Sequence, residues 1–379
     1  MPMSMSTTTT IPRFQKGDRV YGCSFFGAYS TRVVVPMNQL RLIPGGLSFA
    51  KAAAIPAVSL TALYALHLGG RFPFTTTTTT KITTSEKEGQ QQPHNITVIA
   101  PSNKSILIHS AAGGVGSMLV QMSKILGLSP IVGVVGRTAK VDEAKALGCD
   151  VVIDKQRAQS QPQSSPNDNS NNNMWKLIEE SGPQDGYSII MDPNGISTLK
   201  DSYDHLCPTG RLIIFGFHSN LPMGQDSSGL LNPIEWMKMI YKSSQMPQFD
   251  PMDLVSSNKS VLGFNLSFFV DEINMLMPMY DQIEFWLTSF KKEEEETNKD
   301  KDVFDKEEDN DDDDDNGNDS KESNHEKKPK QQLLRCPRVT ELPMDDIVEA
   351  HKLIQSGKTV GKLVMITDCD DDDETTMLK

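Results

Sequence analysis

A run of small residues in the first third of the chain has the composition of a phosphate-binding turn. The apolar stretch Ile106–His109 leads into Ser110-Ala111-Ala112-Gly113-Gly114-Val115-Gly116, and an apolar pattern of helical period follows. The spacing is that of G-x-G-x-x-G with Ala111 in the first position, ahead of Gly113 and Gly116. Small residues let a pyrophosphate approach the backbone, and a helix N-terminus offers it N–H groups and a positive dipole. A tight turn without a ligand is the alternative, but the position between a strand and a helix favours a dinucleotide site.

The residues after the second expected strand indicate which dinucleotide binds. Sites for NAD carry an acidic residue about 20 residues after the glycine motif, where it holds the ribose 2′-hydroxyl. Here that position is Gly136, and Arg137, Thr138 and Lys140 follow it. Two cations and a hydroxyl suit a 2′-phosphate, so the sequence favours NADPH. The alternative is that Arg137 and Lys140 are solvated residues at a helix start.

The cysteines and histidines show no spacing typical of a metal site. The cysteines are dispersed and form no C-x-x-C pair, which indicates reduced thiols in a cytoplasmic protein. They are Cys23, Cys149, Cys207, Cys336 and Cys369. His67, His205 and His218 also lack ligand spacing, so we expect ordinary polar positions for them and no metal.

The negative charge of the chain is concentrated in two segments. The net charge is −13, of which residues 291–330 carry −9 and residues 368–379 carry −5. The remainder is nearly neutral and shows no basic stripe, which argues against nucleic-acid binding. No apolar run reaches the roughly 18 residues of a membrane span. The segment Met1–Pro12 lacks the apolar core of a secretory signal.

Four segments are low in complexity and separate the patterned parts of the chain. They are Thr75–His94, Gln156–Asn173, Lys291–Gln332 and Asp368–Lys379. Such segments bury too little apolar surface to offset the entropy lost on ordering, so we expect solvated loops and tails. The alternative for the acidic segments is an arm that binds a cation or a partner.

Between these segments, strand and helix patterns alternate, which predicts a parallel, doubly wound α/β sheet. The expected strands are Ile106–His109, Ile131–Val135, Val151–Ile153, Ile189–Met191, Leu212–Phe215 and Val261–Leu266. The expected helices are Val115–Leu126, Lys140–Leu147, Met174–Glu180, Ser197–Leu206 and Asp271–Phe290. Towards the N-terminus we expect a β run at Val33–Val35 and a helix over residues 50–66, capped by Ser48 and interrupted at Pro56. Towards the C-terminus we expect strands at Arg335–Val339 and Lys362–Ile366 around a helix at Asp345–Gln355.

Several motifs together resemble the medium-chain dehydrogenase/reductase superfamily, and within it the zinc-free quinone oxidoreductase (zeta-crystallin-like) group. They are Gly17-Asp18-Arg19-Val20 with Gly27-Ala28-Tyr29, Leu47-Ser48-Phe49 with Ala52-Ala53-Ala54-Ile55-Pro56, His109 through Gly116, and Val360-Gly361-Lys362-Leu363-Val364. Met191-Asp192-Pro193 and Gly263-Phe264-Asn265-Leu266 are more specifically similar to the synaptic vesicle membrane protein VAT branch.

The resemblance implies a Rossmann doubly wound parallel sheet plus a GroES-like β-barrel formed by both chain ends. Only 16 residues precede the Gly17 motif, fewer than in the family, so we expect a truncated barrel. The expected domains are a barrel remnant at 1–55, the Rossmann domain at 56–290 with inserts at 75–94 and 156–173, an acidic disordered insert at 291–332, a return to the barrel at 333–367 and an acidic tail at 368–379.

The resemblance also implies a function: hydride transfer from NADPH to a quinone, enone or related electrophilic carbonyl compound. Zinc alcohol dehydrogenases of the superfamily carry a cysteine lobe after the Gly-Asp-x-Val motif, whereas Cys23 stands alone there, so the zinc-free subclass is implied. The alternative is a non-catalytic NADPH-binding protein that acts through partners. The resemblance further implies a homodimer through the edge of the Rossmann sheet, and a cytoplasmic location with peripheral association with vesicle or organelle membranes.

The resemblance assigns residues to the cofactor but names no catalytic acid. The cofactor residues are Thr61 near the nicotinamide, Ala112, Gly113, Gly114, Val115 and Gly116 at the pyrophosphate, Gly136, Arg137, Thr138 and Lys140 at the 2′-phosphate, and Phe215, Gly216, Phe217, Phe264, Asn265 and Leu266 along the nicotinamide ribose and ring, together with Asn194. Core packing is the alternative for Phe215 and Phe264, and a simple turn for Asn194. Tyr29 is the tempting acid, but its Gly-Ala-Tyr context is typical of a structural element of the barrel.

Overall fold

The structure is a computed structural model, and it describes most of the patterned part of the chain. The described residues are 14–24, 26–70, 104–160, 170–216, 237, 241, 244–268, 275–288 and 334–367. The segments 75–94, 291–332 and 368–379, which we expected to be solvated, lie outside the described residues.

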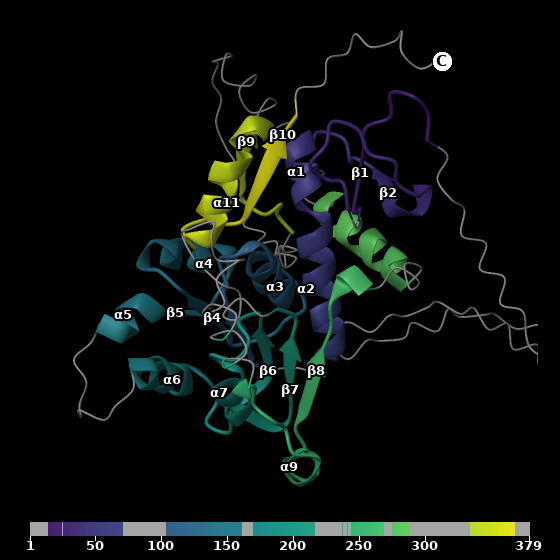
Figure 1. Cartoon of the computed structure of the whole chain (residues 1–379). Coiled ribbons are helices and arrows are strands. Elements are labelled where there is room, and N and C mark those ends of the chain that lie inside the picture. The colour runs from purple at the N-terminus through teal and green to yellow at the C-terminus, as the bar shows by residue number, and fades with distance from the viewer. Residues whose placement is uncertain are drawn as a thin grey trace, which may run out of the picture.

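A six-stranded parallel sheet forms the centre of the molecule (Figure 1). Its strands are β3 (Ile106–His109), β4 (Ile131–Val135), β5 (Val151–Asp154), β6 (Tyr187–Asp192), β7 (Leu206–Ile214) and β8 (Ser260–Gly263). The order across the sheet is β5-β4-β3-β6-β7-β8, and every neighbouring pair is parallel. The chain therefore winds in one direction from β3 to β5 and in the other from β6 to β8. The prediction of a doubly wound sheet is confirmed, and β3 and β6 meet at the switch point, where such sheets bind ligands.

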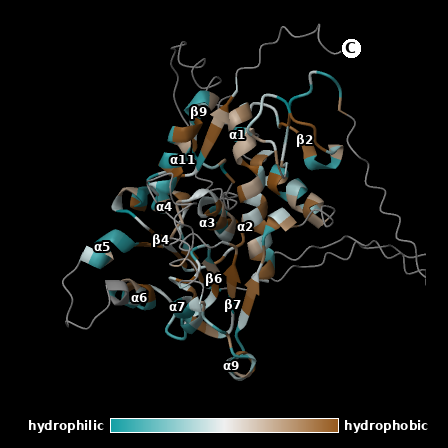
Figure 2. Cartoon of the chain, viewed as in Figure 1, coloured by the Kyte–Doolittle hydropathy of each residue, from teal (hydrophilic) through white to brown (hydrophobic). Residues whose placement is uncertain are grey.

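Helices cover both faces of the sheet, because successive side chains of a strand point to opposite faces. Ile106 and Ile108 of β3 pack with one set of helices, and Leu107 between them packs with the other. The first set is α2 (Pro56–Leu68), α3 (Gly114–Ile125), α4 (Val141–Leu147) and the helical residues 275–288. The second set is α5 (Lys155–Ser160), α6 (Ser170–Ser181), α7 (Leu199–Asp204) and, at its margin, α9 (Pro251–Ser257). Figure 2 shows the strands β6 and β7 as largely hydrophobic, whereas α5 and α9 carry hydrophilic residues.

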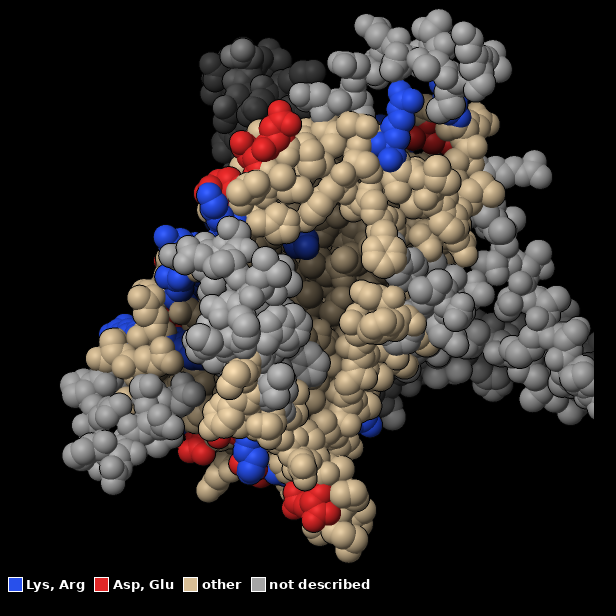
Figure 3. Space-filling model, in the orientation of Figure 1, with Lys and Arg blue, Asp and Glu red and all other residues tan. Residues whose placement is uncertain are grey.

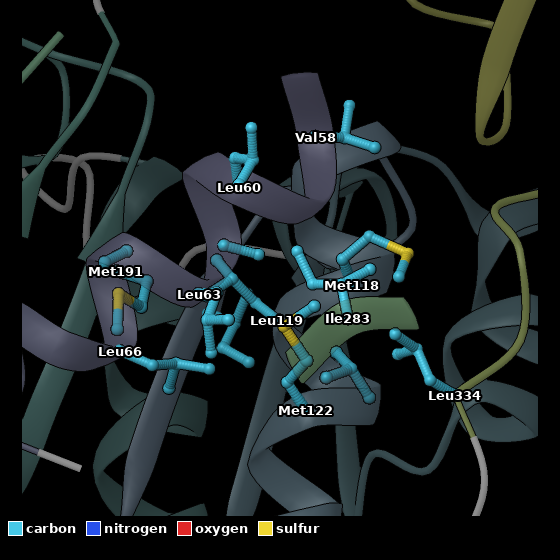
Figure 4. Packing of buried hydrophobic residues seen from close by; sticks show 14 of the residues in the cluster. Val58, Leu60, Leu63, Leu66, Met118, Leu119, Met122, Met191, Ile283 and Leu334 are labelled. Atoms are coloured by element: carbon cyan, nitrogen blue, oxygen red, sulfur yellow. The ribbon is translucent and has the colours of Figure 1, made fainter. Parts of the chain in front are cut away.

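Helices α2 and α3 form the largest part of the core with the sheet beneath them. Figure 4 shows Leu63 and Leu66 of α2 beside Leu119 and Met122 of α3, with Met191 of β6 close by. These side chains are fully buried, and each contributes roughly 1.5–3 kcal/mol of hydrophobic stabilisation. This packing holds α2, which lines the candidate site, against α3, which begins at it.

The apolar helical stretch Phe49–Leu68 is divided as the sequence predicts. Ser48 caps α1 (Phe49–Ala54), because its side chain accepts the Lys51 N–H at 3.2 Å, and Pro56 starts α2. The stretch has 20 residues and a mean hydropathy of 1.5, so it meets the length and composition of a membrane span, contrary to our expectation from apolar runs. Most of it is buried inside the protein, as in the core helix of a soluble protein, so it is weak evidence for a span.

The described segments nearest the two chain ends, which carry β1 and β2 and β9 and β10, lie together at the top of the molecule in Figure 1. The antiparallel strands β1 (Val20–Gly22) and β2 (Leu40–Leu42) form one small sheet. The parallel strands β9 (Val339–Pro343) and β10 (Lys362–Ile366), joined through α11 (Ile347–Gln355), form another. Short 3-10 turns occur at Met37–Gln39, Thr138–Lys140, Leu266–Phe268 and Met344–Asp346. Within the described part of the chain these strands do not close into a barrel. The expected domain boundaries remain predictions.

Two expected strands at the chain ends are wrong. Val33–Val35 is irregular, and Val34 is 100% exposed, because no neighbouring strand pairs with it in the described structure. The strand expected at Arg335–Val339 begins only at Val339, where β10 supplies its hydrogen-bonding partner. A valine-rich run has a preference for extended structure, but a strand also needs a partner.

Other differences concern the length of elements and one insert. Strand β7 begins at Leu206, which shortens the helix expected at Ser197–Leu206 to α7, and β8 ends at Gly263. The insert Gln156–Asn173 is not wholly solvated, because α5 and α6 occupy its ends. Ala158 of α5 is buried, and its carbonyl accepts a hydrogen bond from the Asn173 side chain at 3.4 Å.

Candidate nucleotide-binding site and adjoining cavity

The glycine-rich turn joins β3 to α3 with almost no free space. A Cβ atom on Gly116 would collide with the Ser110 carbonyl oxygen and would lie 2.8 Å from the Ala111 Cα. Both are backbone atoms, which cannot rotate away, so only glycine fits. Ala111 and Ala112 are fully buried beneath the turn. The first turn of α3 therefore lies directly over the end of β3.

The start of α3 is the part of the turn that a ligand could reach. Gly113, Gly114 and Val115 are partly exposed, and Gly113 has extended backbone at the N-cap position. The first N–H groups of a helix have no partner within the helix, so they can donate to a pyrophosphate. Figure 3 shows that this face of the molecule is hollowed above the carboxyl ends of β6 and β7, with a basic side chain on the wall of the hollow.

The residues expected at the 2′-phosphate lie together after β4. Gly136 is exposed, and nothing lies within 4 Å of the position its Cβ would take. Arg137 is half-buried and donates from Nη2 to the Ser356 carbonyl oxygen at 2.8 Å, which uses one of its five N–H donors. Thr138 is exposed beside them.

The two cations of this group repel each other. Burial, and then the charge of Arg137, lowers the pKa of Lys140 below its ordinary value. None of the ion pairs between described residues includes Arg137 or Lys140. A bound dianion would relieve this repulsion and would favour the charged form of Lys140.

Lys362, which we did not expect in the site, reaches the glycine turn from the C-terminal strand. Gly361 pairs with Gly113 in a parallel bridge, and the Gly361 N–H donates to the Ala112 carbonyl oxygen at 3.3 Å. The Lys362 stem then lies over Gly114, where an added Cβ would come within 2.9 Å of its Cδ. Burial lowers the pKa of Lys362, and the nearby Cys23 acts in the opposite direction. In the sequence, the only indication of Lys362 was its position directly after Gly361, at the start of the strand that is β10 in the structure.

A cavity of about 260 Å³ lies between α2, the ends of β7 and β8, and the helical residues 275–288. It adjoins the turn through α2, because Ala57 lines the cavity and a Cβ on Gly114 would lie 3.0 Å from Val58 Cγ1. Five residues expected near the nicotinamide line it, namely Thr61, Phe215, Phe264, Asn265 and Leu266. Residues that sequence reasoning missed complete the lining, among them Cys23, Gln39, Leu60 and Tyr280. The structure thus brings together residues from four distant parts of the chain, and the lining contains both aromatic and polar side chains. Whether they bind a cofactor stays a prediction.

The remaining expected site residues lie near the switch point. The Ser110 hydroxyl donates to Asn194 Oδ1 at 3.2 Å, so Asn194 lies beside the start of the glycine turn. A Cβ on Gly216 would approach the Pro193 carbonyl oxygen to 2.8 Å, which places Gly216 against the same loop. Phe217 lies outside the described residues.

A buried hydrogen-bond network fixes the loop that carries Asn194. Asp192 Oδ1 accepts the Asn194 N–H at 2.8 Å and the Thr198 hydroxyl at 3.0 Å. Its Oδ2 accepts the Ser202 hydroxyl at 2.9 Å, and Ser202 contacts His109 Nε2 at 3.1 Å. The network joins the end of β3 to the end of β6, the two strands that flank the switch point.

Tyr29 lies away from this cavity. It is 61% exposed, and its ring packs edge-on against His351 of α11 at a centroid distance of 5.9 Å. Among the residues that the structure describes, no three His, Cys, Asp or Glu side chains gather as they would around a metal ion. The absence of zinc stays a prediction.

The chain was compared with known protein families and curated proteins. A family model described as a zinc-binding dehydrogenase matches residues 114–281. The synaptic vesicle membrane protein VAT-1 homolog of Homo sapiens is 26% identical over 273 residues, which cover 70% of this chain and 56% of the relative. A quinone oxidoreductase of Pseudomonas aeruginosa is 28% identical over 207 residues, or 54% of this chain and 50% of the relative. The chain spans about half the length of the curated relatives it matches.

Solved structures show the same fold. The quinone oxidoreductase of Escherichia coli in complex with NADPH matches with a TM-score of 0.57 at 18% identity, over 94% of this chain and 77% of that one. A human synaptic vesicle membrane protein VAT-1 homolog-like protein matches with a TM-score of 0.56 at 17% identity, over 96% of this chain and 75% of that one.

Proposed function

We propose that the chain transfers hydride from NADPH to a quinone, enone or related electrophilic carbonyl compound without zinc. The basis is that the chain belongs to the quinone oxidoreductase group of the medium-chain dehydrogenase/reductase superfamily. The six-stranded sheet is the Rossmann domain of this family, and the small sheets at the chain ends belong to the GroES-like domain. The chain is thus an oxidoreductase by family, and the proposal adds the cofactor form and the substrate class.

The observation that carries the proposal is the Arg137–Lys140 pair at the end of β4. The two cations lie close enough for Arg137 to lower the pKa of Lys140, and no described carboxylate forms an ion pair with either. A ribose 2′-phosphate is a dianion that fits between two cations, whereas a 2′-hydroxyl would call for an acidic residue there. The open space at Gly136 leaves room for the phosphate.

The glycine turn and Lys362 fit the pyrophosphate of the same cofactor. Only glycine is tolerated at position 116, so the N–H groups at the start of α3 are held at a fixed place. Lys362 lies over Gly114 and supplies a cation at the helix N-terminus, where the dipole already favours an anion.

The adjoining cavity fits a flat, electron-poor substrate. Phe215 and Phe264 supply apolar surface, with ring centroids 6.0 Å apart, and Thr61 and Asn265 supply polar groups. When bound, NADPH supplies the hydride at the nicotinamide; the residues of this chain bind and orient the two reactants. A quinone or enone accepts hydride without a strong acid, because water can protonate the stabilised anion.

Titration with NADPH and with NADH, followed by nicotinamide fluorescence, tests the cofactor assignment. We expect wild-type protein to bind NADPH more tightly than NADH. Arg137→Ala and Lys140→Ala each remove a charged donor and are expected to weaken NADPH binding about 10-fold while NADH binding is unchanged. Lys145→Ala, an exposed lysine of α4, is the matched control.

A quinone added to the NADPH complex then tests turnover. Oxidation of NADPH supports the oxidoreductase proposal, and tight NADPH binding without oxidation by any quinone or enone would support a non-catalytic NADPH-binding protein instead. Equal affinity for the two nucleotides, or binding of neither, contradicts the assignment of Arg137 and Lys140.

A further inference from the structure

Tyr280 is a buried phenol in the wall of the adjoining cavity. It lies within the helical residues 275–288 and is 4% exposed, yet it lines the same cavity as Thr61 and Asn265. Neither the glycine motif nor the expected nicotinamide residues include it, and the proposed function assigns it no role.

The Tyr280 ring is held from two sides. Tyr21 of β1 packs edge-on against it at a centroid distance of 6.5 Å and an interplanar angle of 80°. The Arg41 guanidinium of β2 lies 5.5 Å from the ring centroid, and Arg41 is itself fixed by an ion pair with Asp281 at 2.8 Å. The hydroxyl therefore has a defined place, which is the condition for a donor that stabilises charge in a transition state.

The hydroxyl is also kept protonated. Burial, and then Cys23, raises the pKa of Tyr280 well above that of a free phenol, and Arg41 only partly opposes this. Burial raises the pKa of Cys23 as well, while its hydrogen bond with Tyr280 and the charge of Lys362 act in the opposite direction. At neutral pH both groups are neutral and line the cavity. The directions of the two pKa shifts make the Tyr280 O–H the donor and the Cys23 sulfur the acceptor, and sulfur is a weak acceptor that a carbonyl oxygen can replace.

We propose that the Tyr280 hydroxyl donates a hydrogen bond to the carbonyl oxygen of a quinone or α,β-unsaturated ketone bound in this cavity, with Cys23 as the positioning residue that orients the hydroxyl. The inference rests on the proposed function, because it names the donor that stabilises the negative charge which hydride transfer places on that oxygen.

The reaction balances with groups already named. A hydride brings two electrons to the β-carbon of the enone and forms a C–H bond there. The π electrons of the C=C bond move towards the carbonyl, so negative charge develops on the oxygen that Tyr280 contacts. Tyr280 stabilises this charge without giving up its proton, and water supplies the proton that completes the saturated ketone.

Other polar groups of the cavity are less suited to this role. The Thr61 hydroxyl already donates to the Ala57 carbonyl oxygen at 2.6 Å, so its proton is engaged within α2. Asn265 Oδ1 accepts the Ser267 N–H at 3.0 Å, and its Nδ2 group can still donate, but the residue is exposed, so water competes for those donors. Tyr280 combines a donor, burial and a ring that residues of two strands, β1 and β2, hold in place.

The test uses the full chain with 2-cyclohexen-1-one as the probe, first without nucleotide. Difference infrared spectroscopy measures the carbonyl stretch of the bound probe. We expect a lower stretching frequency than in water-free apolar solvent for wild type, and loss of that shift in Tyr280→Phe, which keeps the ring. The dissociation constant of the probe should rise about 5-fold, as for one lost hydrogen bond. Tyr187→Phe, at a buried tyrosine outside the cavity lining whose hydroxyl donates to the Ile178 carbonyl oxygen at 2.7 Å, is the matched control and should behave as wild type.

Turnover with NADPH gives the second readout. We expect kcat/KM of Tyr280→Phe to fall on the order of 100-fold, as when one oxyanion donor is removed, while the dissociation constant for NADPH is unchanged. Cys23→Ser, which keeps a hydrogen-bonding partner for the hydroxyl, should retain the carbonyl shift, and Cys23→Ala should weaken it.

The outcomes separate this inference from the proposed function. A carbonyl shift that persists in Tyr280→Phe, or a wild-type protein that does not bind the probe, overturns the role of Tyr280. If wild type binds neither nucleotide, the proposed function fails, and the infrared shift in the nucleotide-free protein still decides whether Tyr280 contacts the carbonyl oxygen. Near-ultraviolet circular dichroism of each variant establishes that the aromatic packing around residue 280 is intact.

Discussion

Gly116 and Gly136 are two glycines of the candidate site with opposite surroundings. A methyl group on Gly116 would press on the backbone of Ser110 and Ala111, which has no room to move. A methyl group on Gly136 would meet nothing within 4 Å. The first glycine is therefore required by helix packing, while the second leaves space for a ligand.

Exchange of each glycine for alanine separates the two roles. Gly116→Ala gains up to about 1 kcal/mol of helix propensity but overpacks the turn, which costs about 1–3 kcal/mol, so we expect net destabilisation. Gly136→Ala should leave the free energy of unfolding unchanged and weaken NADPH binding only. Urea denaturation measures the first effect and fluorescence titration the second. Equal stability of Gly116→Ala and wild type would contradict the close approach of α3 to β3.

His109 is a buried histidine that the structure keeps neutral. Burial lowers its pKa; Asp192 acts in the opposite direction, and Lys155 and His205 add to the lowering. Its Nε2 contacts Ser202, and its Nδ1 has no partner among the described residues. Protonation of the ring would place a charge inside the network that holds Asn194.

We therefore expect stability to fall in acid because of His109. The unfolded chain binds this proton near pH 6.5, whereas the folded chain does so only at lower pH, so the unfolded state binds more protons in between. Stability is complete above about pH 6.5 and falls below it by up to about 1.4 kcal/mol per pH unit. His109→Gln should lose this part of the slope in urea denaturation at about pH 7.5 and about pH 5.5. An unchanged slope in the variant would contradict the assignment.

At the scale of elements, the C-terminal segment 334–367 is attached to the Rossmann domain by a few specific hydrogen bonds. Gln121 of α3 pairs with the backbone of Arg335, accepting its N–H at 2.9 Å and donating to its carbonyl oxygen at 3.3 Å. Arg137 donates to Ser356, and Gly361 donates to Ala112. The same segment thus contacts Arg137, which we propose binds the 2′-phosphate, and the glycine turn.

Loss of the Gln121 side chain should loosen this segment. Gln121→Ala leaves the Arg335 N–H and carbonyl without their partner, which costs about 1–3 kcal/mol for a buried group. We expect faster hydrogen exchange over residues 334–367, with little change in the sheet. Lys124→Ala, at an exposed position of the same helix, is the control. Exchange that speeds up equally in β3 and β6 would show a global effect instead.

Local pattern predicted the elements of the sheet, because a buried strand, a glycine turn and an amphipathic helix each carry their own signal. It failed at Val33–Val35 and at Arg335–Val339, where the outcome depended on a partner strand far along the chain. The candidate site divides in the same way. The glycine turn and the Arg137–Lys140 pair are local motifs that the sequence displays, and their binding roles stay predictions. Lys362 and Tyr280 reach the candidate site only through tertiary packing, so no motif spacing in the sequence predicts that they lie there.

At the scale of the whole molecule, bound nucleotide should tighten parts that are far apart in the sequence. A ligand at 100 times its dissociation constant stabilises the folded state by about 2.7 kcal/mol. Because Arg137 bonds to Ser356 and Gly361 bonds to Ala112, we expect NADPH to slow hydrogen exchange in residues 356–362 as well as in residues 111–116. Arg137→Ala should keep the effect at the turn and reduce it at 356. Protection confined to the turn would contradict the coupling.

The bridge between Gly113 and Gly361 has a consequence for the order in which the protein is made. The last strand of the central sheet, β8, ends at Gly263, so all six strands can pair while the ribosome is still adding the remaining residues. The turn gains its partner strand and Lys362 only when the final stretch emerges. A nascent chain would therefore complete the central sheet before the candidate nucleotide site, and a nucleotide that binds there as we propose could assist only the last step of folding.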